Sequence, residues 1–62
     1  MPFVFVYWFK GRTEEQKARI AEAITGSFAK AAGVPRDEVF VVFVDLERSD
    51  IARAGRLYSA ST

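Results

Sequence analysis

The sequence predicts an α+β fold, built as a short β-α-β unit with two parallel strands. Three observations predict it: an apolar, aromatic-rich stretch over residues 3–9, a helical periodicity that starts near residue 13, and a second apolar stretch over 39–44. A strand, a helix and a strand in this order form a right-handed crossover, so the strands are expected to be parallel. We expect residues 1–62 to form a single domain.

The first predicted strand is apolar on both faces. Phe3, Phe5, Tyr7 and Phe9 alternate along it with Val4, Val6 and Trp8. The helix of one short chain can cover only one of these faces, so the other requires a second subunit. A chain of this size buries only about 60% of the surface that its unfolded form exposes, and it has no cysteine for a disulfide. The sequence therefore predicts self-association.

The predicted helix has clear start and stop signals. Thr13 and Gln16 have the spacing of a capping box, and Gly33 followed by Pro35 ends the helix. Apolar residues recur at helical spacing and predict one buried face, comprising Ile20, Ala21, Ile24, Phe28 and Ala31. The charged residues between them are expected to face solvent, namely Lys17, Arg19, Glu22 and Lys30.

The second predicted strand covers residues 39–44 and is also apolar on both faces. Residues 45–62 show no clear period. Loops are expected there, with a short hairpin that turns at Gly55 and reaches a neighbouring subunit as the alternative.

The composition excludes several classes of function. Nine Lys and Arg against eight Asp and Glu leave a net charge of +1, with no basic run of the kind that binds nucleic acid. The apolar run over 3–9 is far shorter than the roughly 20 residues that span a bilayer, and no basic segment of a signal peptide precedes it. A cytoplasmic protein without membrane or nucleic-acid partners is expected. Histidine and cysteine are absent, which excludes a Cys/His zinc site.

Pro2 is the most informative candidate for catalysis. It follows the initiator methionine, and removal of Met1 would leave a secondary amine at the N-terminus. Apolar surroundings disfavour the protonated form of such an amine, so it can take and return a proton near neutral pH. The alternative is that Pro2 only begins a strand, where its missing N–H is harmless.

Arg12 is the second candidate, because it lies where the first strand ends and the helix begins. A guanidinium at that place can hold a carboxylate through two parallel hydrogen bonds. The alternative is an arginine of the turn that faces solvent.

These features resemble the 4-oxalocrotonate tautomerase family. The resemblance rests on Met1-Pro2, on Gly-Arg-Thr-Glu-Glu-Gln-Lys at 11–17, on Pro35 and on the strand at 39–44. It implies a β-α-β protomer that pairs with a second protomer, in a dimer or in a hexamer of three dimers. It also implies an isomerase that interconverts the enol and keto forms of a small 2-oxo acid, without cofactor or metal. Pro2 would be the base and then the acid, and Arg12 would bind a substrate carboxylate.

Three further candidates for substrate binding are places where the chain differs from the family pattern. The family pattern has a second arginine at the position of Phe40 and an aromatic residue at that of Ile51. It also has a glycine-rich stretch where residues 52–55 of this chain read Ala-Arg-Ala-Gly, which introduces Arg53. With Phe40, a substrate with one carboxylate is expected to be preferred, unless Arg53 supplies the missing charge. Two other functions stay open: hydration or dehalogenation of an unsaturated acid by the same proline, and a non-catalytic oligomeric scaffold.

Overall fold

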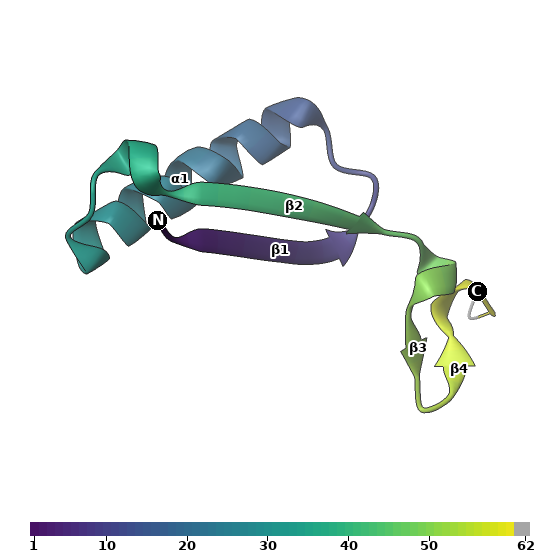
Figure 1. The fold of residues 1–62 in the computed structure, drawn as a ribbon. Helices are drawn as coiled ribbons and strands as arrows, with labels where there is room; N and C mark the ends of the chain where they lie inside the picture. Colours follow the sequence, from purple (N-terminus) through teal and green to yellow (C-terminus); the bar gives the residue numbers. More distant parts are fainter. Residues whose placement is uncertain (61–62) are drawn as a thin grey trace.

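The computed structural model describes residues 1–60 and has the predicted β-α-β order (Figure 1). Its elements are β1 (Phe3–Phe9), α1 (Glu14–Ala32), β2 (Phe40–Leu46), β3 (Ala52–Arg53) and β4 (Arg56–Leu57), with short 3₁₀ helices at Arg36–Glu38, Arg48–Asp50 and Tyr58–Ala60. Strands β1 and β2 are parallel, with Phe3 opposite Phe40 and Phe9 opposite Leu46. The predicted parallel pairing is confirmed.

Both predicted ends of α1 are confirmed by hydrogen bonds. The Gln16 N–H donates to the Thr13 hydroxyl at 3.1 Å, and the Thr13 N–H donates to the Gln16 side-chain oxygen at 3.0 Å. At the other end Gly33 has a φ of +70°, and its N–H donates to the Ala29 carbonyl at 2.9 Å. These caps fix where the chain enters the helix after β1 and where it leaves the helix before β2.

Strand β2 is longer than predicted and starts one residue later. It runs to Leu46, because Trp8 and Phe9 of β1 continue to pair with Asp45 and Leu46. The prediction ended the strand before Asp45, where the apolar run stops. Here the Asp45 carboxylate accepts hydrogen bonds from side chains on β1 and α1, so the strand pairing continues past it.

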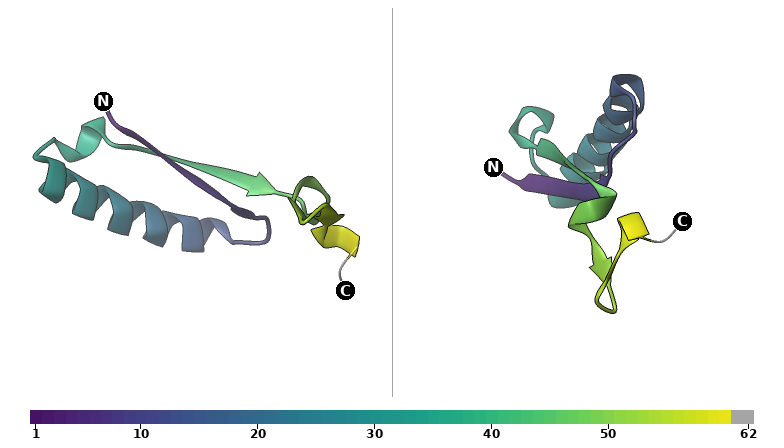
Figure 2. Two further views of the ribbon diagram at one scale, coloured as in Figure 1. Left: turned by 90° about the horizontal axis from the view of Figure 1, so that it is seen from below. Right: turned by 90° about the vertical axis from the view of Figure 1, so that its right-hand side faces the viewer.

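The sheet is covered on one side only (Figure 2). Helix α1 lies against the face that carries Val4, Val6 and Trp8, which are half-buried. On the opposite face Phe3, Phe5 and Tyr7 are 54%, 53% and 65% exposed. Among residues 1–60 no side chain is buried, so a single subunit does not form a closed hydrophobic core.

The dimensions of the chain lead to the same conclusion. Its Cα radius of gyration is 14.9 Å, whereas a compact chain of this length has about 11 Å. Its accessible surface is 4851 Å², whereas a folded monomer of this mass exposes about 4,000 Å². The excess surface is what a subunit of an oligomer would bury against its neighbours.

The segment after β2 forms a hairpin that projects from the end of the sheet (Figure 1). Strands β3 and β4 pair antiparallel around Ala54 and Gly55, so the short hairpin is confirmed, and its contact with a neighbouring subunit stays a prediction. Residues 61 and 62 lie outside the described part of the chain. Within residues 1–60 no helix is long and apolar enough to cross a membrane.

Candidate active site

Pro2 lies at the start of the sheet, next to Phe3 in the chain and beside Phe40 of the neighbouring strand. It is half-buried, and its carbonyl accepts a hydrogen bond from the Phe40 N–H at 2.9 Å. The Phe40 ring stacks on the Phe3 ring, with 4.9 Å between centroids. Met1, in contrast, is 79% exposed. Pro2 and Phe40, two of the predicted site residues, are therefore neighbours in one chain.

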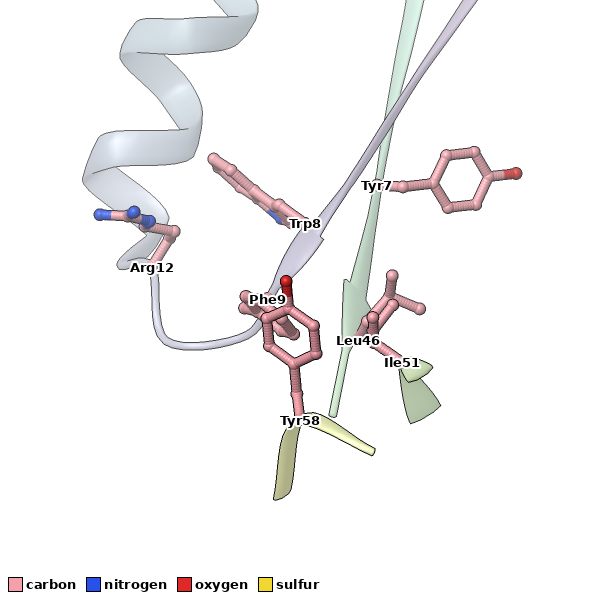
Figure 3. A pocket seen from close by; sticks show the side chains of 7 residues that line it. All are labelled: Tyr7, Trp8, Phe9, Arg12, Leu46, Ile51 and Tyr58. Atoms are coloured by element: carbon pink, nitrogen blue, oxygen red, sulfur yellow. The ribbon is translucent and has the colours of Figure 1, made fainter. Parts of the chain in front are cut away.

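Arg12 lies at the far end of β1, beside a pocket of about 440 Å³ (Figure 3). The pocket is lined by Tyr7, Trp8, Phe9, Arg12, Leu46, Ile51 and Tyr58. The Arg12 guanidinium carbon is 5.9 Å from the centre of the Trp8 ring. Within residues 1–60 no carboxylate forms a salt bridge with Arg12. An exposed guanidinium on an aromatic ring, next to an apolar pocket, is suited to hold a small organic acid.

The Trp8 ring that supports Arg12 is itself held by Asp45. The Trp8 indole N–H donates to one Asp45 oxygen at 2.6 Å, and the Lys17 ammonium contacts the other at 2.8 Å. The same ring stacks on Phe43, with 5.2 Å between centroids. Lys17 was predicted to face solvent, which is wrong: its side chain is 29% exposed and ties α1 to β2. Trp8 and Asp45 were not predicted as site residues. The acidic residue at the end of an apolar run could have indicated a role for Asp45.

Acid is expected to loosen this cluster. The hydrogen bonds from Lys17 and then Trp8 lower the pKa of Asp45. A carboxyl whose pKa is lowered in the folded state stabilises the fold above its unfolded pKa, and this stabilisation is lost as the pH falls through the folded pKa. Trp8 is the only tryptophan, so its fluorescence should change below about pH 4. In Asp45→Asn this acid transition should disappear, whereas Glu38→Gln, a change at an exposed carboxylate, should retain it. An unchanged transition in Asp45→Asn would contradict the assignment.

Tyr58, which follows the hairpin, forms one wall of the Arg12 pocket. The Tyr58 N–H donates to the Ile51 carbonyl at 2.9 Å, and its ring packs against Phe9 with 5.3 Å between centroids. Ile51 thus lines the same pocket as Arg12, as Figure 3 shows. Tyr58 was not predicted as a site residue, because its place in the pocket wall depends on how the hairpin folds back.

One chain does not bring all the predicted site residues together. Pro2 and Phe40 lie at the start of the sheet, and Arg12 and Ile51 lie at its other end. Seven residues of β1 separate them, which corresponds to roughly 23 Å. Arg53 lies on the projecting hairpin. A small acid that touches both Pro2 and Arg12 must therefore bind between subunits. Among residues 1–60 no three acidic, histidine or cysteine side chains gather as metal ligands.

Comparison with known proteins assigns the family. The sequence profile of the family described as "Tautomerase enzyme" matches residues 2–61. The chain belongs to the tautomerase family. It is 45% identical over 58 residues to a probable tautomerase of Ralstonia nicotianae, covering 94% of this chain and 89% of that one. It is 36% identical over 55 residues to the 2-hydroxymuconate tautomerase of Comamonas testosteroni, covering 89% and 87% of the two chains.

Solved structures agree with this assignment. A heterohexameric 4-oxalocrotonate tautomerase of Chloroflexus aurantiacus superimposes with a TM-score of 0.87 and 26% identity over 100% of both chains. The resemblance to the 4-oxalocrotonate tautomerase family and the prediction of an isomerase are thus confirmed for this tautomerase. The predicted β-α-β fold class is confirmed as well.

Proposed function

We propose that this tautomerase, after removal of Met1, interconverts the enol and keto forms of a small 2-oxo acid with Pro2 as the base and acid. The observation that carries the proposal is the position of Pro2. It is the first residue of the family match, it is anchored by Phe40, and it is one peptide bond from a highly exposed Met1. Cleavage of that bond yields a secondary amine at a place fixed by the hydrogen bond between the Pro2 carbonyl and the Phe40 N–H.

The proton transfer follows from these groups. The Pro2 amine takes the proton of the enol hydroxyl, the oxygen becomes a carbonyl, and the amine returns the proton to carbon. No atom is gained or lost, so the reaction requires no co-reactant. A second subunit packed over the exposed Phe3 and Phe40 rings would make the surroundings of Pro2 more apolar, which favours the neutral form of an amine. Arg12 holds the carboxylate of the acid, and the Trp8 ring beneath it fixes the orientation of its guanidinium.

The same proposal includes self-association, in a dimer or a hexamer of three dimers. Pro2 and Arg12 of one chain are too far apart for one small substrate, so Arg12 must come from another copy. The exposed face of β1 and the excess surface of the single chain support contacts of this kind. Phe40, Ile51 and Arg53 are proposed to contribute to the walls of the site between subunits.

An assay of enol acids tests the activity and the role of Arg12. The trimmed protein should accelerate the conversion of enol to keto acid, measured by the loss of enol absorbance. Removal of a charged contact that strengthens in the transition state costs about 10²–10³ in rate, so Arg12→Ala should lower kcat/KM by this factor. Arg19→Ala removes an exposed arginine that pairs with Glu15, and it should leave kcat/KM unchanged.

Two results would count against the proposal. If no enol acid is turned over, the non-catalytic scaffold replaces the proposed enzyme. If unsaturated acids are hydrated or dehalogenated instead, Pro2 keeps its catalytic role but in a different reaction. An Arg12→Ala protein with full kcat/KM on every accepted acid would refute the assignment of Arg12 alone.

A further inference from the structure

Asp45 ties together the two ends of the segment that carries Arg12. It lies directly opposite Trp8 in the pairing of β1 and β2, and one of its carboxylate oxygens accepts the Trp8 indole N–H at 2.6 Å. The other oxygen accepts a hydrogen bond from the Lys17 ammonium on α1 at 2.8 Å. Trp8 and Lys17 flank Arg12, which lies in the link between β1 and α1. One carboxylate therefore holds this link from both sides.

The two bonds of Asp45 are of a strong kind. The hydrogen bonds from Lys17 and then Trp8 lower the pKa of this carboxyl, so it is ionised at neutral pH. Hydrogen bonds to an ionised acceptor are roughly twice as strong as those between neutral groups. The Lys17 and Asp45 side chains are also half-buried, so water competes less for their bond than it would at an exposed site.

These contacts fix the orientation of the Trp8 ring. The indole N–H is bound to Asp45 at one edge of the ring, and the ring stacks on Phe43 with 5.2 Å between centroids. The Arg12 guanidinium carbon lies 5.9 Å from the ring centre, close to the limit of about 6 Å for attraction between a cation and a ring face. A Trp8 ring that turned would lose this contact, so the orientation of Arg12 depends on Asp45.

An arginine that is already held in place loses less conformational freedom when it binds a ligand, and it binds more tightly for that reason. We propose that Asp45 is a positioning residue for the substrate: it fixes the Trp8 ring, which directs the Arg12 guanidinium to the pocket for the carboxylate of the acid. Asp45 acts through Arg12 and need not contact the acid. The inference rests on the proposed role of Arg12.

A double-mutant cycle separates this role from a structural one. Asp45→Ala should lower kcat/KM for an accepted enol acid about fivefold, chiefly by raising KM, which is the effect of losing the attraction between a guanidinium and a ring. In an Arg12→Ala background the same substitution should have no further effect, because it acts through Arg12. Glu22→Ala is the matched control: it breaks the salt bridge to Arg36, which also joins two elements, and should leave KM unchanged.

A binding measurement separates the inference from the proposed reaction. In Pro2→Ala labelled with ¹⁵N, which should not turn over substrate, the Arg12 Nε–H resonance should shift to saturation as sodium pyruvate is added. Adding Asp45→Ala should weaken this binding about fivefold, and this result would stand even if the wild type converted no enol acid. If Asp45→Ala does not assemble, Trp8→Phe retains a ring for Phe43 but cannot donate to Asp45, and it should weaken binding in the same way.

Three results would overturn the role of Asp45. The first is that Asp45→Ala and Arg12→Ala have independent, multiplicative effects on kcat/KM. The second is that assembled Asp45→Ala lowers kcat at unchanged KM, which indicates a loss of active enzyme. The third is that pyruvate produces no saturable shift at Arg12, or binds with unchanged affinity in Asp45→Ala or in Trp8→Phe.

Discussion

Pro2→Ala is expected to lower kcat for the conversion of enol to keto acid by about 10²–10⁴-fold, the usual contribution of a positioned general base. Alanine at position 2 still allows removal of Met1, but it replaces a rigid secondary amine with a primary amine that is free to rotate. The carbonyl of residue 2 can still accept the bond from the Phe40 N–H, so the fold should be unaffected. Stopped-flow or steady-state absorbance of the enol measures the change.

Two comparisons make this result specific to the N-terminal amine. Pro35→Ala changes the other proline, which begins the 3₁₀ helix at Arg36–Glu38, and it should leave kcat unchanged. A protein that retains Met1, verified by intact mass, should be as inactive as Pro2→Ala because its proline nitrogen is an amide. Full activity with Met1 in place would exclude Pro2 as the base.

Placing a carboxylate on the exposed face of β1 is expected to dissociate the oligomer. Phe5 is 53% exposed in the single chain, between Phe3 and Tyr7, and its ring lies 6.5 Å and 6.3 Å from theirs. Burial of such a side chain stabilises by about 1.5–3 kcal/mol, and an unpaired charge in its place costs more. Phe5→Asp should therefore raise the dissociation constant of the oligomer by at least about 100-fold.

Sedimentation measures the dissociation of the oligomer, and an activity assay on the same samples measures its effect on catalysis. At micromolar concentration the wild type should sediment as a species heavier than the 7.0 kDa single chain. Phe5→Asp should lower the sedimenting mass toward that of the single chain. Activity should fall with the oligomer, because the proposed mechanism requires Pro2 of one subunit and Arg12 of another. Ala18→Asp adds the same charge at an exposed position of α1 and should preserve both assembly and activity. A monomeric wild type with full activity would refute the shared site.

The elements of the fold were predictable because their signals are local. The capping residues Thr13 and Gln16, the stop at Gly33 and the apolar run over 3–9 each depend on neighbours within a few residues, and the structure places the elements accordingly. The end of β2 was not predictable in this way. Its last two residues are held by pairing with Trp8 and Phe9, which are far away in the sequence.

By itself the sequence determined the β-α-β order, the family, and the candidate residues Pro2 and Arg12, since residue type and spacing carry that information. Only the tertiary structure decided how these residues relate. It placed Pro2 and Arg12 at opposite ends of β1, because an extended strand separates its ends. It joined Lys17, Trp8 and Asp45, because parallel pairing brings distant side chains to one face. It set Arg53 opposite Arg56, because a two-residue turn fixes the register of the hairpin.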